Sequence, residues 1–327
     1  MWFHHRDMMR DAILGFAKQF AFDPRLEQGP VAFHRKIVVA GMGGSHLAAD
    51  ILANLAPERS IRVWSDYELP YIKRFSFPKT LLVASSYSGN TEETINAYET
   101  AQTKGMPCAI IAVGGTLIEL AKRDHVPYVQ LPNTGIQPRS ALGFSLRGLI
   151  SLLSVQELVG EATYLSQYLD PASLESEGTR VAEVLRDRIP VIYASTANAC
   201  IAYNWKIKLN ETGKIPAFYN LVPELNHNEM TGFDAQGASK PLSEKFAFVF
   251  LRDGQDHERN KRRMEVMAKL YRDRGFPVVE LDLQGVNRME YIFRSLVIAD
   301  WTAVALANHY GLESEQVPMV EEFKKSL

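Results

Sequence analysis

Short runs of apolar, mostly β-branched residues alternate with helical patterns along the first half of the chain. Each run is apolar at nearly every position, which is typical of strands in a parallel sheet that helices cover on both faces. Glycine and proline mark the turns between them. We therefore predict a doubly wound α/β unit, with strands at 36–40, 61–64, 80–84, 108–113 and 128–131 and helices that end near Leu55, Thr103 and Arg123.

The second half of the chain repeats this order of elements. Strands are predicted at 190–194 and 246–251, and helices are predicted to begin at Ala199 and near His257. The phrase Gly-Phe-Pro-Val-Val at 275–279 repeats Gly-Met-Pro-Cys-Ala at 105–109, and both phrases leave a helix through glycine and enter a strand. We interpret this as an internal duplication. One domain is expected at 1–160 and the second at 161–327, joined through a helix in the polar stretch 160–188.

Further helices are predicted outside the repeated pattern. Residues 1–22 form an amphipathic pattern, and long apolar helices are expected at 140–159 and 291–310. These two apolar helices offer more hydrophobic surface than two sheets need, which favours a homodimer with two-fold symmetry. The alternative is that each helix covers its own sheet.

The composition of the chain argues against a nucleic-acid-binding, membrane-bound or secreted protein. The chain has 327 residues and a net charge of -2, so no overall basic field would attract nucleic acid or a membrane surface. The two cysteines, Cys108 and Cys200, lie in apolar stretches and are expected to be buried reduced thiols. No secretory leader and no apolar stretch long enough to span a bilayer is evident in the sequence, so a cytoplasmic protein is expected.

A hydroxyl-rich loop follows the predicted strand 80–84. Ser86, Ser88 and Thr91 lie between this strand and a helix, whose first N–H groups attract phosphate. The sequence Ser-x-Ser-Gly-Asn-Thr-x-Glu favours an anion site, and the alternative is simple capping with Ser88 as the N-cap. The second half has Arg-Asp-Gly-Gln-Asp at the corresponding position, 252–256, so only the first half keeps the hydroxyls.

A glycine-rich loop follows the first predicted strand. Its sequence is Gly-Met-Gly-Gly-Ser-His at 41–46, and His46 stands where a dinucleotide-binding fingerprint has glycine. We therefore expect no nicotinamide cofactor. The loop is predicted to bring Gly44 and Ser45 close to a sugar or its phosphate, and the alternative is a tight turn with no ligand.

Five motifs together resemble a known family. They are Gly-Met-Gly-Gly-Ser at 41–45, Ser-Tyr-Ser-Gly-Asn-Thr-Glu-Glu at 86–93, Pro-Arg at 138–139, Asn-Glu at 210–211 and Glu-Leu-Asn-His-Asn-Glu at 224–229. In this order they resemble the bifunctional phosphoglucose/phosphomannose isomerases, which are built of two sugar-isomerase (SIS) domains with a flavodoxin-like fold. The resemblance covers essentially the whole chain. It implies an aldose–ketose isomerase that interconverts glucose 6-phosphate, and mannose 6-phosphate, with fructose 6-phosphate.

The resemblance also implies roles for individual residues. Glu211 would be the base that moves a proton between C1 and C2, His227 would open the sugar ring, and Arg139 would stabilise the enediolate. A lysine near the C-terminus would complete the site, and we choose Lys324 over Lys325. Taken alone, each of these could be an ordinary solvated or hydrogen-bonded residue.

The chemistry of this reaction sets further expectations. Aldose–ketose isomerisation by a carboxylate, a cation and an acid–base group requires no metal and no organic cofactor. The Glu-x-x-His spacing of Glu224 and His227 could suggest a metal pair, but no third ligand is evident. The family implies a homodimer in which the histidine reaches the neighbouring subunit's site. The alternative function is a non-catalytic SIS module that binds a sugar phosphate as a signal.

Overall fold

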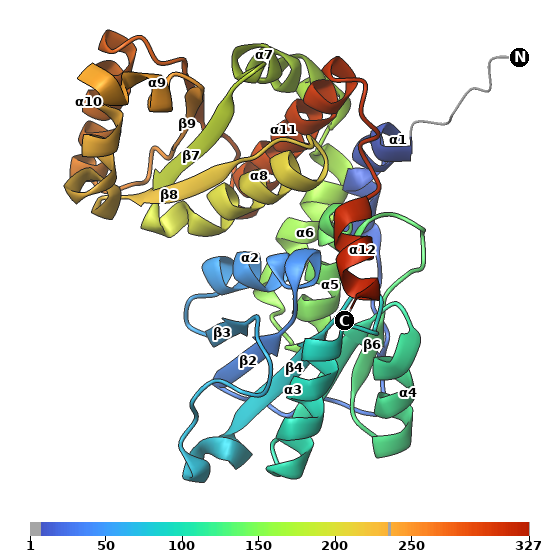
Figure 1. Ribbon diagram of the computed structural model, residues 1–327. Helices are drawn as coiled ribbons and strands as arrows, with labels where there is room; N and C mark the ends of the chain where they lie inside the picture. Colours follow the sequence, from blue (N-terminus) through green and yellow to red (C-terminus); the bar gives the residue numbers. More distant parts are fainter. Residues whose placement is uncertain (1–7, 235–236, 327) are drawn as a thin grey trace, which may run out of the picture. The chain divides into compact units, whose positions relative to one another are not determined.

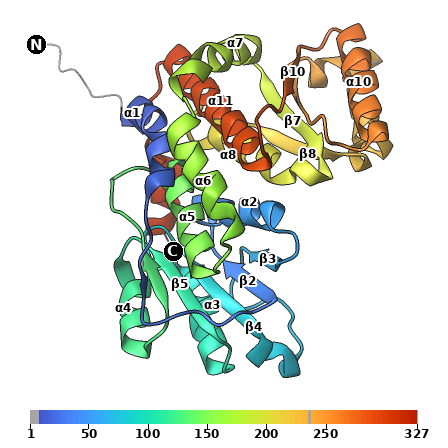
Figure 2. The same cartoon turned by 180° about the vertical axis from the view of Figure 1, so that it is seen from behind.

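The chain folds into two compact α/β units, which we describe separately. The computed structural model describes residues 8–234 and 237–326. One unit spans Gly15–Leu169, and the other combines the first helix with the chain from Asp170 onward. Figures 1 and 2 show a twisted sheet in each unit, seen from two opposite sides.

The unit Gly15–Leu169 is built on a six-stranded sheet with the strand order β1-β6-β5-β4-β2-β3. All neighbouring strands are parallel except the short pair of β1 and β6. The five parallel strands follow the flavodoxin-like order, in which the first strand of the series, β2, lies inside the sheet. The strands are β1 (Leu26–Glu27), β2 (Lys36–Ala40), β3 (Ser60–Trp64), β4 (Thr80–Ser85), β5 (Cys108–Ala112) and β6 (Tyr128–Gln130).

Helices cover both faces of this sheet. Val38 and Ala40 of β2 belong to a buried cluster with residues of α3 and α4. Ile111 of β5 points to the other face, where its Cδ1 lies so close to Gly148 of α5 that an added Cβ would clash. Side chains along these strands point alternately to the two faces of the sheet, so each face packs against its own layer of helices. The helices are α2 (Leu47–Leu55), α3 (Glu92–Thr103), α4 (Gly115–Asp124), α5 (Leu142–Leu152) and α6 (Glu157–Tyr168), with the short 3-10 turn η1 (Phe16–Ala21).

The second unit has a four-stranded, fully parallel sheet with the strand order β10-β9-β7-β8. This is the same winding as in the other unit, one strand shorter at the far edge, and it agrees with the predicted duplication. The strands are β7 (Ile189–Ser195), β8 (Phe218–Val222), β9 (Phe246–Arg252) and β10 (Val278–Asp282). The helices are α1 (Met8–Leu14), α7 (Glu175–Leu185), α8 (Ala199–Glu211), α9 (Lys240–Ser243), α10 (Glu258–Asp273), α11 (Arg288–His309) and α12 (Pro318–Lys325).

An aromatic cluster forms the core on one face of this sheet. Tyr193, Phe248 and Phe250 of the strands pack against Tyr271 of α10, and the rings of Phe248 and Tyr271 lie 4.3 Å apart. A buried ion pair joins helices α8 and α11, where Lys208 Nζ lies 2.6 Å from Asp300 Oδ1. Both side chains of this pair are almost fully buried, so each charge depends on its partner.

The predicted elements agree with the structure in most places, and three of the differences are informative. The helix expected at 140–159 is two helices, α5 and α6, because Ser154 adopts a left-handed backbone conformation with φ of 52°. Strand β8 was not predicted. It is an edge strand with one buried residue, Val222, so its sequence lacks the apolar run of its neighbours.

The third difference concerns the N-terminal helix, which was expected to belong to the first domain. Helix α1 belongs to the unit that contains the second half of the chain. Met9 and Ile13 are buried there, Arg10 forms an ion pair with Glu175, and its guanidinium lies 5.0 Å from the ring centre of Trp301. Residues 1–7 of the predicted helix lie outside the described residues. In the described part of the chain, no helix combines the length and apolar character needed to cross a membrane.

Candidate functional site

The glycine loop and the hydroxyl loop meet at one edge of the first sheet. They follow β2 and β4, which are neighbouring strands, with Ala40 opposite Ala84. From β2 the chain moves outward first to β3 and later to β4 on the other side, so the carboxyl ends of β2 and β4 mark the point where the winding reverses. Open α/β sheets bind ligands in the crevice at this point. The two loops predicted to bind the sugar phosphate therefore lie side by side.

Hydrogen bonds join the two loops. Ser45 Oγ accepts a hydrogen bond from the backbone N–H of Tyr87 at 2.9 Å, and Ser85 Oγ donates to the carbonyl of Ser45 at 2.7 Å. Gly41 lies so close to the Ser85 carbonyl that an added Cβ would be only 2.6 Å from the oxygen. Ser45 therefore has a structural bond in addition to any contact with a ligand.

Three hydroxyls form a cluster in front of helix α3. Ser86 Oγ lies 2.8 Å from Thr91 Oγ1 and 3.4 Å from Ser88 Oγ, and it accepts a hydrogen bond from the N–H of Gly89. Gly89 has a φ of 75°, and an added Cβ would lie 1.8 Å from a backbone oxygen, so only glycine fits this tight turn.

The alternative, in which Ser88 caps the helix, is wrong. The N-cap of α3 is Thr91, and its hydroxyl is bonded to Ser86 rather than to the helix backbone. Ser88 is exposed, and its Oγ accepts a hydrogen bond from Asn90 N. The first N–H groups of α3 therefore receive no capping oxygen from Thr91, and an uncapped helix N-terminus can bind anions.

Arg139 lies against the glycine loop. It belongs to a 3-10 turn, η4 (Pro138–Ser140), and an added Cβ on Gly44 would lie 2.6 Å from its backbone nitrogen. The Arg139 side chain is only 1 % exposed. A guanidinium presents five donors in a planar fork, which suits pairs of charged oxygens. The structure thus brings six predicted residues of the first unit together: Gly44, Ser45, Ser86, Ser88, Thr91 and Arg139.

Glu211 is the last residue of helix α8 in the second unit. Its carbonyl accepts a hydrogen bond from Lys214 Nζ at 2.6 Å, and the same ammonium group donates to the carbonyl of Gln316. The neighbouring Asn210 donates from Nδ2 to the carbonyl of Ile215 at 3.2 Å, which closes the turn after the helix. The Glu211 side chain is half-buried. The turn that carries Glu211 is therefore fixed from two directions.

His227 lies in a 3-10 turn, η7 (Glu224–His227), directly after strand β8, and it is exposed. The turn is anchored two residues later by Glu229, whose carboxylate accepts hydrogen bonds from the Tyr193 hydroxyl at 2.5 Å and from Asn220 Nδ2. Burial, together with the nearby Glu229 carboxylate, raises the pKa of Tyr193 far above its ordinary value, so the hydroxyl stays a donor. Glu229 thus holds the histidine turn against strands β7 and β8.

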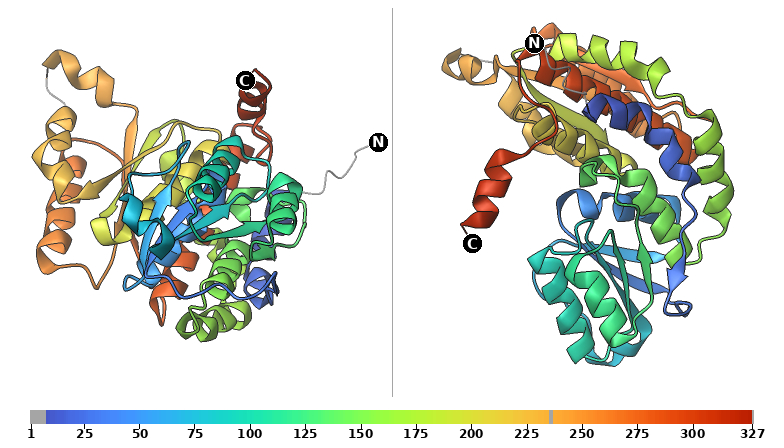
Figure 3. Two further views of the ribbon diagram at one scale, coloured as in Figure 1. Left: turned by 90° about the horizontal axis from the view of Figure 1, so that it is seen from below. Right: turned by 90° about the vertical axis from the view of Figure 1, so that its right-hand side faces the viewer.

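The structure does not bring Glu211 and His227 of one chain together. Helix α8 ends at the amino edge of the sheet, and η7 begins at the carboxyl edge, so strand β8 separates them. A strand of five residues is roughly 13–17 Å long. Lys324 lies elsewhere again, on helix α12, where it is exposed and forms an ion pair with Glu321 at 2.9 Å. Figure 3 shows this helix extending away from the rest of its unit.

The carboxyl edge of the second sheet carries a different set of groups. Asn198 follows β7 and donates to the buried carboxylate of Asp253, which follows β9, at 3.0 Å. Arg288 forms an ion pair with the same carboxylate at 2.8 Å. The described loops after β7 and β9 thus hold a carboxylate paired with an arginine, where the first unit has the hydroxyl cluster.

No metal centre is assembled from the described residues. The carboxylate of Glu224 accepts a hydrogen bond from Asn228 at 3.0 Å. Across residues 8–234 and 237–326, histidine, cysteine and carboxylate side chains nowhere gather in groups of three that could hold a metal ion. The Glu-x-x-His pair therefore gains no third ligand from this part of the chain.

Comparison with known proteins adds independent observations. Residues 174–327 match the family model of the bacterial phospho-glucose isomerase C-terminal SIS domain. A relative from Aquifex aeolicus (strain VF5), named bifunctional phosphoglucose/phosphomannose isomerase, is 34% identical over 96% of each chain. A relative of the same name from Caldicellulosiruptor bescii is 32% identical over 89% of each chain.

A solved structure has the same fold. Glucosamine-6-phosphate deaminase from Thermotoga maritima superposes with a TM-score of 0.66, covering 95% of this chain and 96% of that chain, at 14% sequence identity. At this identity the likeness concerns the fold alone.

Proposed function

Because the chain belongs to the family of bifunctional phosphoglucose/phosphomannose isomerases, we propose that it interconverts glucose 6-phosphate and mannose 6-phosphate with fructose 6-phosphate through an enediolate. The observation that carries the proposal for this chain is the hydroxyl cluster of Ser86, Ser88 and Thr91 at the N-terminus of α3. It offers phosphate a set of neutral donors at the edge of the sheet where ligands bind. The sugar phosphate can then bind and leave without a strong ion pair.

In the proposed mechanism, Glu211 removes the proton from C2 of the open-chain aldose and returns it to C1. The enediolate that forms between these steps carries negative charge on O1 and O2, and Arg139 stabilises it. His227 serves the preceding step, ring opening, in which a proton is delivered to the ring oxygen and another is taken from O1. Lys324 is the proposed C-terminal site lysine. Because protons alone move, the reaction consumes no oxidant or cofactor.

We further propose a homodimer in which the histidine of one chain serves the site of the other. The strand that separates Glu211 from His227 in one chain supports this arrangement, since base and ring-opening group must act on neighbouring atoms of one sugar. The two buried cysteines, Cys108 and Cys200, are free thiols, and we propose that the enzyme works in the cytoplasm, where thiols stay reduced.

The function is tested by mixing the purified full chain with fructose 6-phosphate and following the sugars by ¹³C NMR. The proposal requires both glucose 6-phosphate and mannose 6-phosphate to appear, and it requires the rate to be insensitive to chelators. A protein that binds fructose 6-phosphate but forms neither product would be the non-catalytic SIS module. Formation of one aldose alone would restrict the enzyme to one of its two proposed activities.

A further inference from the structure

Helix α10 and the turns η7 and η8 (Glu229–Phe233) line an open groove of about 410 Å³ in the second unit. Among the described residues that line it, three are arginines and none is acidic: Arg259, Arg262 and Arg263. Asn226 adds an amide at the side of η7, and Met230 and Met267 add thioether surface. Volumes of this order are common for pockets that bind small ligands.

The positive charges of the three groove arginines have few or weak partners within the protein. Arg262 pairs with Glu265 at 3.1 Å, but the two side chains are 70% and 54% exposed, so this pair is worth little and exchanges readily. Arg263 reaches Asn226 Oδ1 at 3.5 Å, the outer limit of a hydrogen bond. The guanidinium of Arg259 has no ion pair or hydrogen bond within the described part of the chain.

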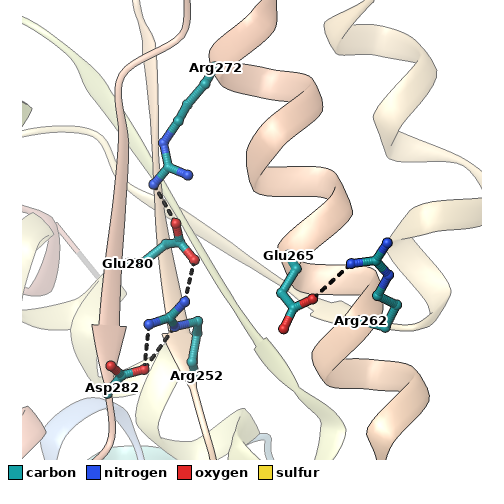
Figure 4. A network of polar contacts seen from close by, with 6 residues as sticks. All are labelled: Arg252, Arg262, Glu265, Arg272, Glu280 and Asp282. Atoms are coloured by element: carbon teal, nitrogen blue, oxygen red, sulfur yellow. Dashed lines mark hydrogen bonds and ion pairs between the residues drawn. The ribbon is translucent and has the colours of Figure 1, made fainter.

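Two other arginines of this unit, Arg272 and Arg252, are paired with carboxylates. Figure 4 shows that Arg272 of α10 and Arg252 of β9 share the carboxylate of Glu280, and Arg252 also contacts Asp282 at 2.7 Å. Their charges are thus balanced within the fold, as a structural ion-pair network requires. The groove arginines lack such a network, and their positive charge is left for a partner.

We propose that this groove is a second anion-binding site, built for a small phosphorylated compound with at least two anionic groups. Guanidinium groups bind phosphate and carboxylate oxygens in a bidentate way, and three of them exceed the need of a single monoanion. The first turn of α10 begins at Glu258, so Arg259 also lies in the positive end of the helix dipole. Met230 and Met267 are flexible apolar side chains, so they can pack against the carbon skeleton of such a ligand.

The extent of the patch favours a small ligand over a polyanion. The lysines of the same helix are paired with carboxylates, Lys261 with Glu258 and Lys269 with Asp273, so they do not extend the patch into a long basic track. Nucleic acid needs a longer basic track, since its affinity grows with the number of phosphates it contacts. The groove differs from the hydroxyl cluster of the other unit, which contains no cation in its loop. The groove shares the turn η7 with His227, which the proposed function places in the partner chain's active site, so the test measures binding and needs no isomerase activity.

Methionine methyl groups provide a local test. In full-length protein labelled with ¹³C at the methionine methyls, Met230 and Met267 report on the groove, and Met42 reports on the glycine loop. Inorganic pyrophosphate is titrated in at constant ionic strength. The proposal requires saturable shifts of Met230 and Met267, with Met106 in the core of the other unit unchanged. Shifts of Met42 alone would show that the only anion site is the hydroxyl cluster, and the proposal would fail.

Variants make the assignment specific. Arg259→Gln combined with Arg263→Gln should weaken the response of Met230 and Met267 by about tenfold or more, because two charge-assisted contacts are lost. Lys269→Gln, which removes one positive charge from an exposed residue of the same helix, should leave the response within about twofold. Equal weakening by the control, or an unchanged response of the double variant, overturns the proposal. A response to oligoglutamate but not to pyrophosphate would also overturn it, in favour of a surface for acidic polypeptides.

Discussion

Glu211 and His227 lie at opposite edges of one parallel sheet, separated by the length of strand β8. Glu211 ends α8 at the amino edge, and His227 ends η7 at the carboxyl edge. The atoms that the two residues would serve, C2 and the ring oxygen, are both bonded to C1 of the same sugar. A base and an acid must each come within hydrogen-bond distance of their atoms, roughly 3 Å. One chain's pair cannot do both across a packed sheet.

Subunit exchange should therefore restore activity between two inactive variants. Glu211→Gln and His227→Ala proteins are each expected to be inactive. In a mixed dimer, one site carries both lesions and the other carries none, so activity should return toward half of normal per heterodimer. The measurement is isomerase activity after mixing, with exchange followed by fluorescence energy transfer between labelled chains. Demonstrated exchange without any recovered activity would contradict the shared site.

Glu211→Gln should lower kcat by roughly 10²- to 10⁴-fold, the range that a general base contributes, while KM changes little. Glutamine keeps the shape of the side chain but cannot take the proton. Glu183→Gln, on an exposed position of α7, is the matched control and should have normal kinetics. Near-normal turnover of the Glu211 variant would exclude this residue as the base.

Replacing Ser86 and Ser88 together by alanine should raise KM for fructose 6-phosphate roughly ten- to hundredfold, with kcat less affected. Hydrogen bonds to a charged group are worth roughly 1.5–3 kcal/mol each, and the phosphate is distant from the reacting carbons. Steady-state kinetics measure the effect, and Ser173→Ala on the surface of the other unit is the control. An unchanged KM, with the fold intact by circular dichroism, would leave the cluster as a structural turn.

Gly44→Ala should reduce activity strongly and destabilise the first unit by about 1–3 kcal/mol, the usual cost of overpacking. The new Cβ would lie 2.6 Å from the backbone nitrogen of Arg139, so the turn η4 would have to move. Gly160→Ala is a matched control, because a Cβ there meets nothing within 4 Å and its helix should gain stability. Urea unfolding of both variants, read together with their activity, separates the two effects.

Asp256 should make the second unit more stable as the pH falls from neutral toward 4. The residue is 8% exposed, and burial raises the pKa of its carboxyl, with a bond from Ser195 opposing the shift and Asp253 adding to it. A raised pKa means that the folded state takes up the proton first. The penalty of the buried charge is therefore present at neutral pH and disappears below the unfolded value.

The Asp256→Asn variant tests this sign. Its advantage in free energy of unfolding over the natural protein should be largest at neutral pH and should shrink as the pH falls through the range of the raised pKa. Urea unfolding followed by the fluorescence of the buried Trp205 gives the measurement, and exposed Asp187→Asn is the control. A constant difference across this pH range would show that Asp256 does not carry the penalty.

The sequence by itself predicted most of the strands and helices, the duplicated winding and the two loops that we propose bind the sugar phosphate. These are local properties: hydrophobic periodicity and turn residues act over a few positions. Strand β8 was missed because only one of its residues, Val222, is buried at the edge of the sheet. The break at Ser154 was missed because a single left-handed residue leaves no periodic signal.

Only the tertiary structure decided which of these elements meet. Arg139 is distant from Gly44 in the sequence, yet its backbone packs against that loop, and helix α1 joins the other half of the chain. The separation of Glu211 from His227 depends on a strand whose direction no local pattern fixes. The arginines of α10 form a groove because η7 packs beside them. Such contacts join residues far apart along the chain, so packing and topology determine them, and no short stretch of sequence encodes them.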